Sequence, residues 1–459
     1  MSALETSAED LAALMTQATK LAAEYWASLE DRPSYPSTSG AETARLFDRP
    51  WADQGRGGDV LNDFRLIAEH VRPCPGRFFG YVAGSGEPVA AIGDFLASVL
   101  NQNTTSWRSA PAAVTIERAV VGWLADAVGC SGFAGSLCGG GSTANLMGLA
   151  IARENVLPAN EDGARPGVVY ASEQVHMSIA KAIALLGLGS RNLRLIPVDG
   201  DLRMRTDALA EAIAGDRRSG RTPMAIVASV GAVATGAIDP LREIAAIAER
   251  EGLWLHADGA FGVLAALAAP EKFDGLDLAD SISLDAHKWL YQPIDCSCLL
   301  YRERDAARKT FSYAGDYVRI FNSDPGESFA FFEKSIELSR RFRALKLWLS
   351  LQYHGRAAFR EAIAADLGHA QLLAETVRAH PELELLAPVP LSAVCFRHRF
   401  KDNEAVLRRV IARGRVYLSN ATIGGQFALR ACFVNHRTEP ANVHEIVAEV
   451  IAAAGELNG

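Results

Sequence analysis

Basic residues are not in excess in this sequence. The 459 residues include 46 lysines and arginines against 54 aspartates and glutamates, which gives a formal net charge of −8. A protein that binds nucleic acid or an anionic membrane electrostatically usually carries a basic patch or stripe. The sequence therefore predicts neither partner, and its 49% hydrophobic and 22% charged residues are typical of a globular protein.

The seven cysteines form no framework. Their odd number and irregular spacing are not those of a disulfide-stabilised protein. Cys296 and Cys298 are separated by one residue, but no second pair stands at zinc-finger spacing. We therefore expect no metal site, and we expect the cysteines to be small buried side chains in a reducing compartment.

A basic leader and a long apolar run are also missing. The first ten residues carry acids where a secretory signal would carry lysine or arginine. The longest uncharged stretch, 127–152, is interrupted by seven glycines and by polar residues, which does not fit a membrane helix. These features favour a cytoplasmic protein.

Apolar runs from about residue 85 to 310 follow an α/β pattern. Strand-like runs lie at 168–170, 193–196, 225–228, 253–255, 281–284 and 298–301, with helical patterns between them, such as 178–186, 207–214 and 240–251. This alternation predicts a mostly parallel central sheet covered by helices. We expect the last run to return antiparallel, at an edge or an insertion.

The two ends of the sequence have their own patterns. Residues 8–31 have helical spacing and precede two prolines, so this helix packs either on its own domain or on another subunit. Residues 335–375 are strongly helical. Strand-like runs at 391–397, 415–419 and 427–434 and a helix at 441–453 predict a small C-terminal α/β domain. The predicted divisions are an N-terminal arm (1–84), a large domain (85–370) and a small domain (371–459).

The strongest chemical signal lies after two strand-like runs. Residues 283–289 read Ser-Leu-Asp-Ala-His-Lys-Trp, and the run at 253–255 is followed by His256, Ala257 and Asp258. Lys288 has apolar neighbours, where a charged ammonium is costly and a covalent bond to an aldehyde is favoured. Asp258 can pair with a pyridine nitrogen. Pyridoxal phosphate has both an aldehyde and a pyridine nitrogen, so the two segments predict an enzyme that uses this cofactor.

Two further segments fit the same cofactor. Residues 138–146 read Cys-Gly-Gly-Gly-Ser-Thr-Ala-Asn-Leu before a helical pattern, and both the glycines and the helix N-terminus favour phosphate. Alone, this segment would be a plain capped turn. His176 follows the run at 168–170, at the strand edge where ligands gather in α/β sheets. A histidine there is either structural or stacks on a planar cofactor.

The order and spacing of these segments resemble the group II pyridoxal-phosphate amino-acid decarboxylases, which include the aromatic amino-acid, histidine, glutamate and diaminobutyrate decarboxylases. The resemblance extends from about Pro73 to Val434. It implies the aspartate-aminotransferase type of fold, fold type I. It also implies a homodimer with active sites at the subunit interface, in which the helix at 8–31 packs on the partner.

The resemblance assigns a role to each matching residue. Lys288 would hold the cofactor, Asp258 its ring nitrogen and His176 one face of the ring. The remaining cofactor contacts would be Ala260 on the other ring face and Gly141, Ser142 and His287 at the phosphate.

A loop after the lysine carries the catalytic tyrosine of the aromatic amino-acid decarboxylases, which returns a proton to the substrate carbon. The same distance from Lys288 leads to Tyr317, and Tyr313 lies four residues before it. Relatives that produce aldehydes tend to have phenylalanine at this position. Tyr317 therefore favours plain decarboxylation, and its loop position suits a lid that excludes water.

The substrate pocket departs from the aromatic enzymes. The matching positions are Pro73, Tyr81, Val82, Asn103 and Thr105. Tyr81 remains aromatic, whereas the amide and hydroxyl groups suit a polar side chain, which such pockets select strongly. The alternative is that the asparagines only cap the helix before Pro111. Arg340 matches an arginine near the active site of the family.

These observations predict a pyridoxal-phosphate decarboxylase of an L-amino acid, with an aromatic substrate first and an acidic or other polar one second. An aminotransferase would need a carboxylate-binding arginine in the small domain, for which Arg430 is a candidate. A carbon–carbon lyase of the sphingosine-phosphate type shares the large-domain segments but usually has a membrane anchor. A cofactor-bound regulator would usually carry a DNA-binding appendage, and none is visible.

Overall fold

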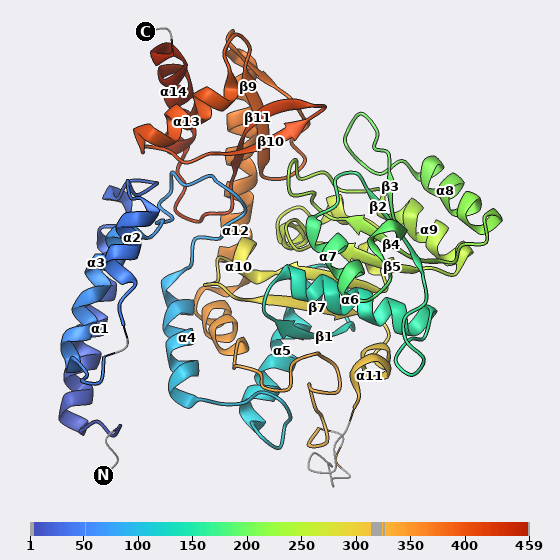
Figure 1. The fold of residues 1–459 in the computed structure, drawn as a ribbon, viewed down its shortest axis with the longest axis horizontal. Coiled ribbons are helices and arrows are strands. Elements are labelled where there is room, and N and C mark those ends of the chain that lie inside the picture. The colour runs from blue at the N-terminus through green and yellow to red at the C-terminus, as the bar shows by residue number, and fades with distance from the viewer. Residues whose placement is uncertain (1–3, 51, 314–323, 325, 458–459) are drawn as a thin grey trace.

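The computed structural model describes residues 4–50, 52–313, 324 and 326–457. A seven-stranded sheet lies at the centre of the molecule between helices, and a smaller four-stranded sheet stands beside it near the C-terminus (Figure 1). This arrangement confirms the expected α/β class, with a mostly parallel large sheet and a small C-terminal unit.

The large sheet has the strand order β1-β7-β6-β5-β4-β2-β3. Its strands are β1 (Ala134–Cys138), β2 (Val168–Ser172), β3 (Leu193–Ile196), β4 (Pro223–Ser229), β5 (Trp254–Asp258), β6 (Ser281–Asp285) and β7 (Ser297–Tyr301). Strands β2 to β6 are parallel, whereas β7 is antiparallel to both of its neighbours. The antiparallel return of β7 is confirmed, and of the two expected positions β7 takes the inserted one, between β1 and β6, rather than the edge. The short, small-residue sequence of β1 gave no strand signal.

Helices bury both faces of this sheet, because its central strands are apolar on both sides. They are α4 (Pro88–Leu100), α5 (Pro111–Ala127), α6 (Gly141–Val156), α7 (Met177–Leu185), α8 (Thr206–Arg218), α9 (Leu241–Glu251), α10 (Ala286–Trp289) and α11 (Ala306–Phe311). Tyr170 and Ile226 face the cluster that contains α5 and α9, whereas Val169 and Val227 face α6 and α7. This alternation follows from the two-residue period of a strand.

The C-terminal unit is an antiparallel sheet of order β10-β11-β9-β8 with its own apolar cluster. Its elements are β8 (Leu383–Leu385), β9 (Ala393–His398), α13 (Asn403–Arg413), β10 (Ser419–Ile423), β11 (Gln426–Cys432) and α14 (Pro440–Glu456). The expected strand at 415–419 is therefore wrong by several residues. The helix α12 (Ala344–Ala379) packs on both units. Residues 335–343 do not form the expected helix, because the Arg340 amide and the Arg340 and Arg343 side chains bind amide and acidic groups elsewhere in the chain.

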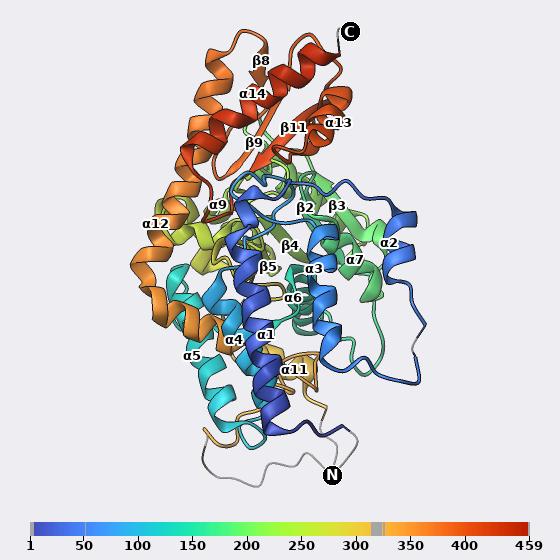
Figure 2. The same ribbon diagram turned by 90° about the vertical axis from the view of Figure 1, so that its left-hand side faces the viewer.

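The N-terminal part of the chain contains the α-helices α1 (Ala8–Ala27), α2 (Gly40–Phe47) and α3 (Asp63–His70). Figure 2 shows α1 and α3 running side by side in front of the large sheet. The Ser7 side chain accepts a hydrogen bond from the Asp10 amide and thereby caps α1. The helix predicted at 8–31 is confirmed apart from its last turn, a 3₁₀ helix at Leu29–Asp31. Within the described ranges, no helix has both the length and the apolar character needed to span a bilayer.

Candidate active site

The candidate site lies at the carboxyl ends of three neighbouring parallel strands. β4, β5 and β6 end at Ser229, Asp258 and Asp285. Beside them is a cavity of about 230 Å³, lined by Gly139, Gly140, Gly141, Ser142, Asn145, Gln174, His176, Ser229, Gly231, Ala232, Val233, Asp258, Ala260, Phe261, Asp285, His287 and Lys288. We call this space the first cavity. All seven residues expected to bind the cofactor line it.

Lys288 enters the first cavity from α10, the short helix that follows β6. Its Nζ lies 2.8 Å from Oδ2 of Asp285, a carboxylate that is 3% exposed. The Ser297 hydroxyl donates to the same carboxylate. Asp285 thus balances the lysine charge and directs the amine into the cavity.

Asp258 is held as a hydrogen-bond acceptor at the end of β5. Its Oδ2 accepts from Asn145 Nδ2 at 3.0 Å, and its Oδ1 accepts from the Ser283 hydroxyl at 3.1 Å. The Ala260 amide also donates to Oδ1, at 3.3 Å. All three contacts use the carboxylate oxygens as acceptors, so Asp258 is oriented to accept a further hydrogen bond from a protonated ring nitrogen.

The glycine segment forms the wall at the N-terminus of α6. Gly140 has a φ of 119°, which a residue with a side chain rarely adopts. A Cβ on Gly141 would lie 2.8 Å from the Ala260 Cβ and 2.9 Å from Asp285 Oδ2. Only glycine permits this close approach, which leaves the backbone N–H groups of a 16-residue helix accessible to an anion.

Two histidines contribute neutral rings. His176 caps the N-terminus of α7, where its Nδ1 accepts from the Ser178 amide at 3.2 Å. Nδ1 of His287 donates to the Cys296 carbonyl at 3.0 Å. Burial lowers the pKa of both histidines, so neither carries a permanent charge near neutral pH.

The residues of the first cavity fit pyridoxal phosphate. Lys288 would hold its aldehyde carbon, and Asp258 would accept from its ring nitrogen. The glycine cradle at Gly141, together with Ser142, offers donors and space for its phosphate. Each group of the cofactor therefore has a matching protein group in the cavity.

A second cavity of about 420 Å³ adjoins the first. Its lining is Tyr81, Val82, His176, Val233, Ala234, Lys288, Ser419, Asn420, Ala421, Thr422 and Arg430. Tyr81 has a φ of 59°, which is strained for an aromatic residue and typical of functional sites. The Arg430 guanidinium donates to the carbonyls of Ala234 and Tyr81, so it ties the small sheet to the cavity walls.

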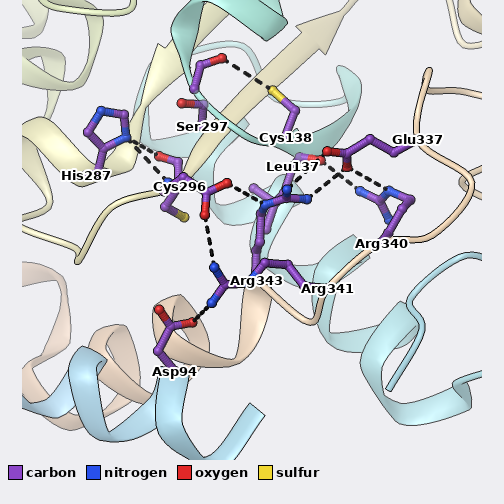
Figure 3. A network of polar contacts seen from close by, with 12 residues as sticks. Asp94, Leu137, Cys138, His287, Cys296, Ser297, Glu337, Arg340, Arg341 and Arg343 are labelled. Carbon is purple, nitrogen blue, oxygen red and sulfur yellow. Dashed lines mark hydrogen bonds and ion pairs between the residues drawn. The ribbon is translucent and has the colours of Figure 1, made fainter. Parts of the chain in front are cut away.

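Three of the expected substrate residues line neither cavity in this chain: Asn103, Thr105 and Arg340. Arg340 is 2% exposed and donates to the Glu117 carboxylate and to the Leu137 carbonyl. Figure 3 shows Arg340 and its neighbours Arg341 and Arg343 with their guanidinium groups turned toward carboxylates and a carbonyl. The Arg340 amide in turn donates to Asn103 Oδ1. Tyr317 lies outside the described residues.

Some residues of the first cavity were not expected from the sequence. Asn145 and Ser229 are examples, together with the loop at 231–233. Ser229 could have been found by its place at the end of the strand-like run at 225–228. Asn145 gave no signal, because a buried asparagine inside a helical pattern has no distinctive spacing. Across the part of the chain that the structure describes, no group of three His, Cys, Asp or Glu side chains could hold a metal.

Comparison with known proteins agrees with this geometry. The model of the pyridoxal-dependent decarboxylase conserved domain matches residues 52–399. The chain belongs to this family. It is an amino-acid decarboxylase that depends on pyridoxal phosphate.

Three proteins that resemble this decarboxylase illustrate the range of the family. The chain is 32% identical to an aromatic-L-amino-acid decarboxylase of Bacillus atrophaeus, over 99% of this chain and 98% of the relative. It is 30% identical to a 4-hydroxyphenylacetaldehyde synthase of Rhodiola rosea, over 92% and 90% of the two chains. The crystal structure of Oryza sativa TDC with PLP and tryptamine matches with a TM-score of 0.92 at 27% identity, over 100% and 99%.

Proposed function

We propose that this decarboxylase converts an aromatic L-amino acid into the corresponding amine and carbon dioxide. The observation that carries the proposal is that the two cavities share His176, Val233 and Lys288. An amino acid whose nitrogen lies at Lys288 therefore extends its side chain into the second cavity, beside the ring of Tyr81. The relatives named above include an enzyme of aromatic L-amino acids and a protein crystallised with tryptamine.

Residues of the first cavity would assist cleavage of the bond between the substrate α-carbon and its carboxyl group. When bound, pyridoxal phosphate supplies an aldehyde for the amino group and a ring that accepts the electron pair of that bond. Lys288 would hold the aldehyde group until the substrate amine takes its place, and its own amine would then remain beside Asp285. Asp258 would accept a hydrogen bond from the protonated ring nitrogen, which would make the ring a better electron acceptor. The substrate carboxyl group leaves as carbon dioxide, and one proton replaces it on the carbon.

Two groups are candidates to deliver that proton. His176 lines both cavities, and its Nδ1 is hydrogen-bonded to Ser178. Its Nε2 is therefore the ring nitrogen that could deliver a proton to the substrate. Tyr317 is the second candidate, on the resemblance to the family alone. A Tyr317→Phe variant that forms aldehyde or oxo acid in place of amine would assign the proton to Tyr317, whereas full amine formation would assign it to another group.

A polar L-amino acid is the second candidate substrate. Ser419, Asn420 and Thr422 of β10 line the second cavity together with Tyr81, whose amide donates to the Ser419 hydroxyl oxygen. Hydroxyl and amide groups in a closed site select strongly for a substrate that pairs with them. An acidic or other polar side chain would use these groups, whereas an aromatic one would use Tyr81.

We further propose a cytoplasmic homodimer. Helix α4 exposes five large apolar side chains, namely Ile92, Phe95, Leu96, Val99 and Leu100, with exposed fractions between 40% and 64%. A contiguous apolar face of this kind is typical of a subunit interface. A dimer would also bring Asn103 and Thr105, just after α4, toward a partner. Sedimentation should give twice the 49.2 kDa chain mass, and a monomer at micromolar concentration would contradict the proposal.

The decisive experiment is a substrate screen by mass spectrometry. The enzyme loaded with pyridoxal phosphate is incubated with each common L-amino acid, and amine and carbon dioxide are measured together. We expect equal amounts of an aromatic amine and carbon dioxide. Preferred turnover of glutamate, aspartate or diaminobutyrate would support the polar candidate, and formation of an oxo acid without carbon dioxide would overturn the proposed reaction.

A further inference from the structure

One buried amide joins the groups of the first cavity. Asn145 lies in the second turn of α6 and is 1% exposed. Its Nδ2 is 3.0 Å from Asp258 Oδ2 and 2.9 Å from the Ser178 hydroxyl, and its Oδ1 is 2.9 Å from His256 Nε2. The side chain of Asn145 thus contacts β5 and α7 at once, and it also lines the cavity.

The charge of Asp258 decides how this amide is oriented. An ionised carboxylate only accepts hydrogen bonds, so the NH₂ group of Asn145 must face it. The carbonyl of Asn145 therefore faces His256, whose Nε2 must carry a hydrogen. Its Nδ1 then accepts from the Ser281 hydroxyl at 2.8 Å, while the Ser281 oxygen accepts from Trp254 at 2.8 Å. Burial lowers the pKa of His256 to about 4, so it is neutral.

The second N–H of the Asn145 side chain determines the tautomer of His176. It donates to the oxygen of Ser178, so the Ser178 hydroxyl hydrogen is free to donate to His176 Nδ1, 2.8 Å away. The Ser178 backbone amide donates to the same nitrogen. Because Nδ1 accepts two hydrogen bonds, the hydrogen of the neutral His176 ring lies on Nε2.

We propose that Asn145 is a positioning residue that sets the hydrogen-bonding roles of Asp258, His256 and His176 together. Asp258 is kept in place as a hydrogen-bond acceptor, and His176 is kept as an Nε2–H donor. An amide performs this task because it has both a donor group and an acceptor and does not change charge between pH 5 and 9. The inference rests on the proposed cofactor site, but its first test does not require the cofactor.

Gly148, one turn further along α6, makes the contact with His256 possible. A Cβ on Gly148 would lie 2.6 Å from Cε1 and 2.7 Å from Nδ1 of His256. The imidazole therefore packs against the bare backbone of the helix. Gly148→Ala would displace the His256 ring without removing any atom of the hydrogen-bonded chain, and so offers a second route to the same effect.

The test is ¹⁵N NMR of histidine-labelled protein without cofactor, which reports the tautomer of each ring. The His256 signal is assigned by its loss in His256→Gln. We expect His256 to be a neutral Nε2–H tautomer in the wild type and to lose this preference in Asn145→Ala. Asn155→Ala is the matched control, because Asn155 lies on the same helix and donates only to the carbonyls of Ile151 and Ala306.

Cofactor binding gives the second readout. The dissociation constant of pyridoxal phosphate should rise about tenfold in Asn145→Ala, because a hydrogen bond to a charged group is lost. It should remain within twofold of the wild type in Asn155→Ala. Asn145→Asp and Gly148→Ala extend the test if Asn145→Ala does not fold. A wild-type His256 tautomer in every folded variant overturns the proposal. It is also overturned if the cofactor affinity is unchanged in Asn145→Ala but falls in Lys288→Ala and Asp258→Ala.

Failure of the cofactor site itself would look different. If Lys288 and Asp258 did not hold pyridoxal phosphate, the affinity would be insensitive to Asn145, Lys288 and Asp258 alike, while the histidine spectrum would still change in Asn145→Ala. That combination would overturn the proposed site and the cofactor part of this inference, and it would leave the hydrogen-bonding roles intact.

Discussion

The two cavities of this decarboxylase are built in different ways. The first cavity is formed by the ends of neighbouring parallel strands and the start of α6, and its charged groups have protein partners. The second cavity is assembled from a loop near residue 81, the loop after β4 and the strand β10 of the small sheet. The first is a rigid frame within one sheet, whereas the second joins segments that are more than 300 residues apart.

This difference separates the tasks of the enzyme. The groups that would bind the cofactor are fixed by backbone geometry, which gives the orientation that catalysis requires. The groups that would contact the substrate side chain lie on loops and on an outer strand, where substitutions disturb the core less. Changes in the first cavity should therefore affect reaction rate, and changes in the second should affect the choice of substrate.

The largest effect is expected from Lys288→Ala. The variant loses the amine that holds the cofactor and directs the substrate, so kcat/KM should fall by at least about 10³-fold. The visible absorbance of the bound cofactor should also be lost, whereas the fold should persist. Lys181→Ala, on α7, is the control. Retention of the absorbance by Lys288→Ala would move the site away from the first cavity.

Arg340→Met tests a residue that the family resemblance assigned to substrate. It leaves Glu117, which is 0% exposed, without its cation, so the free energy of unfolding should fall by about 3–5 kcal/mol. Arg341→Met is the control, since its ion pairs are half exposed and contribute about 0–1 kcal/mol. Denaturant unfolding measures both. Wild-type stability with a raised KM in Arg340→Met would place this residue in substrate binding instead.

Acid should lower the free energy of unfolding by protonating His256, which is buried beside the first cavity. Its pKa is lowered to about 4 in the folded protein, whereas the unfolded chain binds the proton near pH 6.5. The stabilisation is therefore complete above pH 6.5 and is lost as the pH falls toward 4. Between these values, the free energy of unfolding should drop by about 1–3 kcal/mol more in the wild type than in His256→Gln.

Urea unfolding at several pH values provides this measurement. His444→Gln, which replaces an exposed histidine of α14, is the control. The same pH dependence in His256→Gln and in the wild type would mean that His256 does not couple folding to protons.

Tyr81→Ala probes the second cavity and should have the smallest effect. Loss of one ring contact should lower kcat/KM for an aromatic substrate about tenfold, mostly through KM. Tyr353→Ala is the control, because Tyr353 is 73% exposed on α12. A fall in kcat at constant KM would show that Tyr81 acts on the reacting carbon. It would contradict the proposal that the first cavity determines the reaction rate and the second the choice of substrate.

The features best predicted from the sequence are those with a local pattern of their own, namely the parallel strands, the helices between them and the segments that carry the cofactor-binding residues. The parallel strands and the helices between them were confirmed, because buried strands are short apolar runs bounded by turns. The first cavity followed from them, since residues at the ends of parallel strands meet at one edge. Lys288, Asp258 and Gly141 lie in segments whose composition already indicates their chemistry.

Long-range contacts could not be predicted in the same way. The segment at 335–343 has a helical composition, yet Arg340 and Arg343 bind Glu117 and Asp295, which lie far away in the sequence. Strand β1 has too few apolar residues to stand out and is defined by pairing with β7. Asn145 acquires its role only because Asp258 and His256 approach it in space. The spacing of residues in the sequence does not predict contacts between segments that are far apart in the chain.

We propose that the first cavity holds pyridoxal phosphate through Lys288. Borohydride reduction of the cofactor-loaded enzyme, followed by proteolysis and mass spectrometry, identifies the lysine involved, because reduction fixes the cofactor to the amine that carries it. We predict a single modified peptide in which Lys288 bears the pyridoxyl group. Modification of another lysine, with Lys288 unmodified, would contradict the claim.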